Sequence, residues 1–236
     1  MTDVTGIIRM LYPQRCPVCR RVTGEGLCHP ACLKILPWTG GTVCMKCGKP
    51  LADETQEYCA DCEENEHAYE EGRAVWIYDD LLRDMIADYK YRFKKEYAEF
   101  FAWCAVKKLG GYIRDIRPDV IIPVPISRKR RRKRGYNQAA AVSNIVGSCL
   151  NIPTDTHSLR RGRSTLPQKE LDPSMRLLNL SKAFYTEKKL SYKTVLIIDD
   201  IYTTGSTMDA CAAALKKAGV KKVYFAALCI GADNEI

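Results

Sequence analysis

The segment of the chain with the most distinctive chemistry is VLIIDDIYTTGST, residues 195–207. Four apolar residues are followed by two adjacent carboxylates, Asp199 and Asp200. A short apolar run of this kind predicts a buried strand of a parallel sheet. Ligands of parallel sheets bind outside the carboxyl ends of the strands, so this pair of acids is a candidate binding site.

The residues after the two acids have the composition of an anion-binding turn. We expect a tight turn that ends at Gly205, where the backbone can approach a ligand closely, and a helix that begins near Ser206. The N-terminus of a helix offers free N–H groups and a positive dipole end to a phosphate. Hydroxyl groups add further donors from Thr203, Thr204, Ser206 and Thr207.

The two carboxylates would repel that phosphate if they touched it. They therefore fit a different part of the ligand, either hydroxyl groups or a Mg²⁺ ion. A phosphate with a vicinal diol close by describes a ribose 5-phosphate. The chain contains no G-x-x-x-x-G-K-[ST] motif and no G-x-G-x-x-G after a strand, which argues against P-loop and dinucleotide-binding folds.

Eight cysteines between residues 16 and 62 form four close pairs, which indicates two structural zinc sites. We favour sequential pairing, although the spacing leaves interleaved pairing open, and His29 is an alternative ligand in the first site. The predicted ligand sets are Cys16, Cys19, Cys28 and Cys32 for one ion, and Cys44, Cys47, Cys59 and Cys62 for the other.

Disulfides and redox-active Cys-x-x-Cys motifs are the alternatives to zinc. A reducing cytoplasm argues against the first and the clustering of four pairs against the second. A closed four-thiolate site has no open position for a substrate, so we expect a structural role. The remaining cysteines stand singly in the chain and are predicted core residues: Cys104, Cys149, Cys211 and Cys229.

The rest of the chain predicts an α/β domain, because short apolar runs alternate with helical patterns. Strands are expected at 74–78, 120–122, 195–198 and 223–229, and helices at 82–109, 137–150 and 206–218. We divide the chain into a zinc module, residues 1–64, an acidic linker, residues 63–72, and an α/β domain, residues 73–236. Residues 160–181 are polar without a period, and we interpret residues 160–179 as a lid over the site.

Residues 195–207 closely resemble the phosphoribosyl-pyrophosphate motif of type I phosphoribosyltransferases. More of the chain is similar to the ComF family, whose members include competence proteins needed for DNA uptake. The matching elements are the cysteine pairs, Tyr89-Lys90-Tyr91, Ile122-Pro123-Val124-Pro125, Arg134-Gly135-Tyr136-Asn137-Gln138-Ala139, Arg163-x-Thr165-x-Pro167-Gln168-x-x-Leu171 and Arg176-x-x-Asn179-x-x-x-Ala183-Phe184.

The resemblance implies a type I phosphoribosyltransferase-like fold, with a mostly parallel sheet, flanking helices and a zinc ribbon in front. It also implies that Asp199 and Asp200 hold the ribose hydroxyls, that residues 203–207 hold the 5-phosphate, and that Mg²⁺ accompanies the ligand. The loop of Ile126, Ser127 and Arg128 would face the pyrophosphate. The reaction would be displacement of pyrophosphate by a nitrogen nucleophile, but neither a general base nor the residue that recognises the acceptor can be found in the sequence.

Residues 128–134, RKRRRKR, are seven consecutive cations. They are either a solvated surface or a phosphate-binding segment, at the site mouth or along single-stranded DNA. Tyr136 would stack on a base or simply pack. Lys90 is interpreted as a surface lysine, with a pyrophosphate contact as the alternative.

Charge and hydropathy narrow the class of protein. Of the 37 Lys and Arg residues, 30 lie in residues 71–236, and the net charge is +9, which favours a phosphate-bearing partner. No apolar run reaches membrane-span length and the first 15 residues lack a secretory pattern, so we expect a soluble, cytoplasmic protein without membrane insertion.

Three functions remain open at this stage. The first is a ComF-like protein that binds phosphoribosyl pyrophosphate, supports DNA uptake and, by the resemblance, meets single-stranded DNA and a helicase-like competence protein. The second is a metabolic phosphoribosyltransferase with no DNA role. The third is a phosphoribosyl-pyrophosphate sensor without turnover.

Overall fold

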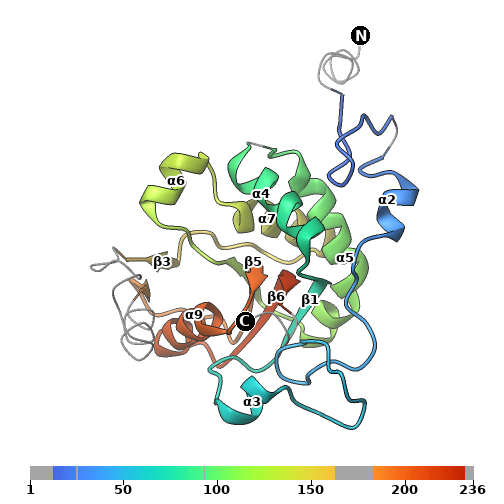
Figure 1. Cartoon of the computed structure of the whole chain (residues 1–236). Helices are drawn as coiled ribbons and strands as arrows, with labels where there is room; N and C mark the ends of the chain where they lie inside the picture. Colours follow the sequence, from blue (N-terminus) through green and yellow to red (C-terminus); the bar gives the residue numbers. More distant parts are fainter. Residues whose placement is uncertain (1–12, 25, 93, 163–182, 232–236) are drawn as a thin grey trace, which may run out of the picture.

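The structure, a computed structural model, describes residues 13–24, 26–92, 94–162 and 183–231 (Figure 1). Its strands are β1 (Gly72–Ile77), β2 (Val120–Pro123), β3 (Leu159–Arg161), β4 (Phe184–Thr186), β5 (Thr194–Tyr202) and β6 (Lys222–Ile230). Its helices are α2 (Pro30–Lys34), α3 (Ala60–Glu64), α4 (Asp80–Tyr91), α5 (Tyr97–Ile116), α6 (Arg128–Arg134), α7 (Gln138–Leu150) and α9 (Ser206–Lys217).

Within the described residues, four strands form a parallel sheet in the order β1-β6-β5-β2. Strand β5 lies between β6 and β2, with Ile197 opposite Phe225 on one side and Ile122 on the other. Because the strands are parallel, their carboxyl ends share one edge of the sheet. The two acids of β5 and the loop after β2 are thereby brought to the same edge.

Helices cover both faces of the sheet, as the apolar runs of β2 and β5 require. One face packs against α4, α5 and α7, and the other against α9 and the second half of the zinc module (Figure 1). Alternate residues of β5 serve the two layers: Leu196 and Ile198 lie in the first, Val195 and Ile197 in the second. The predicted mostly parallel sheet with flanking helices is confirmed.

The long helix expected at residues 82–109 is instead two helices, and Gly110-Gly111 does not end the second. Helix α4 ends at Tyr91, because the next residue, Arg92, has non-helical dihedral angles, and α5 continues to Ile116. The stop is Arg117, in the left-handed conformation before Pro118, because the residue before a proline avoids the helical region. Gly110 is buried inside α5.

The single cysteines are a partial success of the sequence analysis. Cys104, Cys211 and Cys229 are buried, as predicted. Cys149 is exposed near the end of α7, so the prediction for it was wrong. Cys149 stands in the last turn of α7, which ends at Leu150, and its neighbours Ser148 and Asn151 are exposed as well.

The zinc module lies against the edge of the sheet and makes direct hydrogen bonds to it. Residues 37–39 run beside β1, with bonds from Thr39 N to Val75 O and from Ile77 N to Pro37 O. The third cysteine pair, Cys44 and Cys47, also reaches β1, through a bond of 2.8 Å from Gly72 N to O of Lys46, which lies between the two cysteines. Residues 63–72, expected as a linker, also bond to the α/β domain, so this segment belongs to the contact between the two parts.

None of the helices within the described ranges is both long and apolar enough to cross a bilayer.

Candidate functional site

The two acids lie inside the last part of β5. The strand continues beyond them to Tyr202, so Asp199 still pairs in register with Ala227 of β6. Both acids are partly buried, and the N–H of Asp200 donates to Oδ1 of Asp199 over 2.8 Å. Strand pairing therefore fixes the backbone of both acids at the carboxyl edge of the sheet.

Lys90 of α4 supplies the cation that this acidic pair needs. Its Nζ lies 2.7 Å from Oδ1 of Asp200, and the two side chains are only 14% and 15% exposed. The sequence analysis treated Lys90 as a surface lysine by default, and the structure shows it in the site instead. Only its place in the Tyr89-Lys90-Tyr91 motif pointed to a role, because α4 and β5 are about a hundred residues apart in the chain.

The electrostatics of the pair favour one proton on Asp199. Burial, and then the neighbouring charge of Asp200, raise the pKa of Asp199 to about 8, while Lys90 and Arg161 oppose that rise. Folding therefore favours the protonated form of Asp199 relative to an exposed carboxyl group. A ligand with hydroxyl groups or a bound cation would favour its ionised form.

The turn after β5 presents free N–H groups. Gly205 caps α9 with a left-handed φ of 74°, and in the described part of the chain no side chain caps this helix. The first N–H groups of α9 thus remain available to an anion. The hydroxyls of Thr204 and Ser206 lie 2.8 Å apart at the same turn, and a hollow of about 30 Å³ lies against it. We call residues 203–207 the phosphate turn.

The loop that follows β2 is held next to β5. The N–H of Val124 donates to Ile198 O, and the side chain of Asn137 donates to Val124 O over 3.0 Å. Ser127 caps α6 by accepting from the N–H of Arg130. The predicted pyrophosphate loop of residues 126–128 therefore follows the strand adjacent to the two acids.

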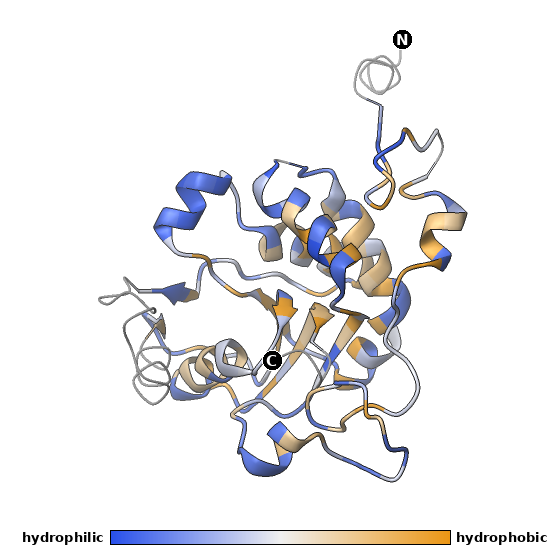
Figure 2. Cartoon of the chain, viewed as in Figure 1, coloured by the Kyte–Doolittle hydropathy of each residue, from blue (hydrophilic) through white to orange (hydrophobic). Residues whose placement is uncertain are grey.

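The basic run folds as helix α6, which is hydrophilic along its length (Figure 2). Its last residue, Arg134, is buried and donates to Gln138 and to the hydroxyl of Tyr91. The other six cations are exposed. Tyr136 packs against Tyr89 and donates to its carbonyl, in line with the packed alternative for this residue.

Arg161 of β3 is a second cation that the topology brings to the site. Burial and the charge of Arg130 lower the pKa of Arg161, whereas Asp199 raises it, so all three side chains share one electrostatic environment. Its guanidinium group also lies 5.1 Å from the ring centre of Phe184 on the paired strand. Residues 163–179 of the predicted lid lie outside the described residues, and its first residues, Arg160 and Arg161, belong to β3.

Within the part of the chain that the structure describes, two groups of side chains could hold a metal ion, and they follow the sequential pairing. Cys44, Cys47, Cys59 and Cys62 have their sulfur atoms within 4.8 Å of one another, as do the ligand atoms of Cys16, Cys19, His29 and Cys32.

The distances fit tetrahedral zinc. Zn–S bonds of about 2.3 Å place ligand sulfurs about 3.8 Å apart, and the Cys47–Cys59 distance is 3.6 Å. Cys28 also lies near the first group, with its sulfur 3.5 Å from that of Cys16, so His29 and Cys28 both remain candidate fourth ligands. Two cysteine-rich zinc ribbon sites are thus present, suited to structural Zn²⁺.

Two protein families match the chain, one over the part that contains the cysteine pairs and one over most of the α/β domain. The double zinc ribbon domain family matches residues 7–63, and the phosphoribosyl transferase domain family matches residues 112–235.

Individual relatives span most of the chain. Competence protein F of Haemophilus influenzae is 29% identical over 89% of this chain and 93% of its own. Competence protein ComFC of Bacillus subtilis is 26% identical over 83% of this chain and 80% of its own. The purine phosphoribosyltransferase of Pyrococcus horikoshii is 24% identical, with a TM-score of 0.33 over 55% of this chain and 72% of the other. The resemblance to the ComF family is confirmed.

Proposed function

Because the chain belongs to the phosphoribosyl transferase domain family, we propose that it binds phosphoribosyl pyrophosphate with Mg²⁺ and acts as a ComF-like protein in DNA uptake. The observation that carries the proposal is the phosphate turn, an uncapped helix N-terminus placed directly after two acids at the carboxyl edge of the sheet. A ribose 5-phosphate needs these two kinds of group side by side.

Each part of the site has a distinct task in this proposal. The free N–H groups and hydroxyls of residues 203–207 hold the 5-phosphate, and Asp199 and Asp200 accept hydrogen bonds from the ribose hydroxyls. Lys90 keeps the two carboxylates from repelling each other strongly.

In this proposal the loop of Ile126, Ser127 and Arg128 binds the pyrophosphate end of the ligand. Arg161 lies close enough to Asp199 to share its electrostatic environment. Mg²⁺ would neutralise the pyrophosphate as a leaving group. Carboxylate and phosphate oxygens are the ligands that Mg²⁺ prefers, and the two acids of β5 provide the former.

The exposed cations of α6 support a nucleic-acid partner. Six exposed positive charges on one short helix attract a phosphate backbone, and we propose single-stranded DNA and a helicase-like competence protein as partners. We place this activity in the cytoplasm, because thiolate ligands need a reducing compartment.

Calorimetry with phosphoribosyl pyrophosphate and Mg²⁺ tests the proposal. The wild-type protein should bind, and the double variant Asp199→Asn/Asp200→Asn should bind at least tenfold more weakly. Asp80→Asn is the matched control, since Asp80 is an exposed acid of α4 whose partner is Arg83 on the surface. Equal binding by the double variant and the control would refute the assignment of the two acids.

Two further measurements separate the open functions. DNA binding that falls steeply with salt, and that is lost when residues 128–134 are made neutral, would favour DNA uptake. Membership of the phosphoribosyl transferase domain family supports an enzymatic reaction with phosphoribosyl pyrophosphate. Release of pyrophosphate that depends on one small nucleophile would favour a metabolic enzyme. Binding that Asp199→Asn abolishes, with no product formed by any acceptor, would favour a sensor.

A further inference from the structure

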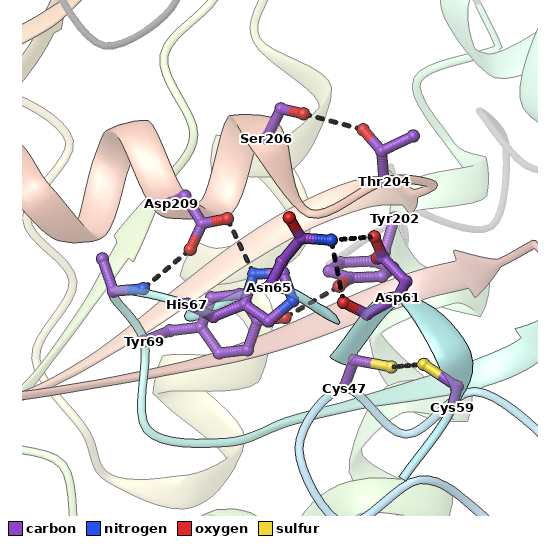
Figure 3. Close-up of polar contacts among 11 residues, drawn as sticks. Cys47, Cys59, Asp61, Asn65, His67, Tyr69, Tyr202, Thr204, Ser206 and Asp209 are labelled. Atoms are coloured by element: carbon purple, nitrogen blue, oxygen red, sulfur yellow. Dashed lines mark hydrogen bonds and ion pairs between the residues drawn. The ribbon is translucent and has the colours of Figure 1, made fainter. Parts of the chain in front are cut away.

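The phosphate turn packs against residues 67–69, which follow the zinc module in the chain. The hydroxyl groups of Tyr202 and Tyr69 are 2.7 Å apart (Figure 3). A Cβ atom at Gly205 would lie 2.7 Å from the Tyr202 hydroxyl and 3.2 Å from Cε1 of His67. The turn therefore touches this segment directly, without room for an intervening side chain.

The same segment holds the carboxylate in the first turn of α9. Asp209 accepts from the N–H of Ala68 and from Nδ1 of His67, each over 2.8 Å. Figure 3 shows Asp209 on one side of the helix and the hydroxyls of Ser206 and Thr204 on the other. A carboxylate so close to the helix start would repel a bound phosphate unless it is turned away and neutralised.

His67 is suited to neutralise Asp209. Its side chain is only 3% exposed, and the hydrogen bond to Asp209 raises the pKa of His67. The ring also stacks on Tyr69, with centres 4.8 Å apart, so its orientation is fixed by packing as well as by hydrogen bonding.

The second four-cysteine group packs close to residues 67–69. Cys44, Cys47 and Cys59 belong to the same buried cluster as Tyr69 and Tyr202. Helix α3, which lies between Cys59 and residue 65, ends with a bond from Asn65 N to Asp61 O. A metal ion would tie the two knuckles together, and small thiolate sites depend on their ion for much of their folding free energy.

We propose that His67 and Tyr69 are positioning residues for the phosphate turn and that a metal ion at the second four-cysteine group holds them in place. This group consists of Cys44, Cys47, Cys59 and Cys62. Metal retention at this group and binding of the ligand phosphate then strengthen each other. The inference rests on the proposed function, since it takes phosphoribosyl pyrophosphate as the ligand. Linkage makes the effect reciprocal: if the metal favours the ligand, the ligand favours the metal by the same factor.

Zinc release from the full-length, zinc-loaded protein tests the coupling. Release into a colorimetric chelator is followed to equilibrium with and without saturating phosphoribosyl pyrophosphate and Mg²⁺. We expect the apparent zinc affinity of one of the two sites per chain to rise by about fivefold or more, the lower end of typical coupling, and that of the other site to stay unchanged. Equal release of both ions with and without the ligand would overturn the proposal.

Variants of His67 provide the reciprocal measurement. His67→Ala should weaken binding of phosphoribosyl pyrophosphate by about fivefold, and His67→Asn, which keeps a donor near the position of Nδ1, should restore most of it. His157→Ala is the matched control, because His157 is exposed and bonds to the adjacent Thr156.

The outcomes separate this inference from the proposed function. If the wild-type protein does not bind phosphoribosyl pyrophosphate, both fail. If it binds, but either zinc release is the same with the ligand or His67→Ala binds the ligand as well as the wild-type protein does, only the coupling fails. If His67→Ala does not fold, zinc release from the wild-type protein decides alone.

Discussion

Replacing Lys90 with methionine tests whether the acidic pair depends on this buried cation. The Lys90–Asp200 distance of 2.7 Å corresponds to an attraction of about 6 kcal/mol at an effective dielectric constant of about 20. Desolvation of both groups offsets part of it, since each side chain is about 15% exposed. Removal of Lys90 leaves the charge of Asp200 beside Asp199 without its nearest cation. We therefore expect Lys90→Met to lower the free energy of unfolding by about 3 kcal/mol.

Urea denaturation at pH 7.5 measures this loss, and a double-mutant cycle with Asp200→Asn isolates the pair. The double variant should recover about 1.5 kcal/mol or more, because it no longer holds an unpaired carboxylate. Lys108→Met, at an exposed position of α5, is the control and should change stability by less than about 0.5 kcal/mol. A loss in Lys90→Met as small as that of the control, or a coupling near zero, would refute the reasoning.

Three further results are expected. In urea denaturation, Gly205→Ala should lower the free energy of unfolding by about 1 kcal/mol more than Gly135→Ala does. Both glycines have a left-handed φ, but only at Gly205 does the new Cβ meet the Tyr202 hydroxyl. Equal losses of unfolding free energy in the two variants would contradict this. Metal analysis should find about two zinc ions per chain and about one in Cys44→Ser, and clearly less than one in the wild-type protein would refute the zinc interpretation. The pKa of Asp199 is raised from 3.8 to about 8, so the folded protein keeps a proton that the unfolded chain releases. The free energy of unfolding of the wild-type protein, relative to that of Asp199→Asn, should therefore fall by about 1 kcal/mol or more between pH 5 and pH 8. A difference that does not change with pH would contradict this.

Local pattern was enough to locate the strand–turn–helix unit of the site. The apolar run of residues 195–198, the glycine at 205 and the helix from Ser206 are all set by neighbours in the chain, and the structure has them where they were expected. The spacing of the cysteine pairs likewise indicated two metal sites. Such features depend on contacts within about a dozen residues, which a single sequence displays directly.

Helix lengths and side-chain faces were less accessible to the sequence. The apolar stripe of α4 and α5 reads as continuous, and only Arg117 before Pro118 marks where α5 ends. Cys149 lies on the same side of α7 as the buried Val142, yet it is exposed, because it stands in the last turn of the helix, where Ser148 and Asn151 are exposed as well.

The long-range partners were decided by tertiary structure alone. Lys90 reaches Asp200, and His67 reaches Asp209, across 110 and 142 positions in the chain. The Tyr89-Lys90-Tyr91 motif pointed to Lys90 but not to its partner, and no motif pointed to His67. The first contact arises when α4 packs on the sheet, and the second when the segment after the zinc module docks against α9. The sequence by itself identified the candidate groups for binding a phosphate and a metal ion, because their types and spacing are local; folding decided which charges lie beside them.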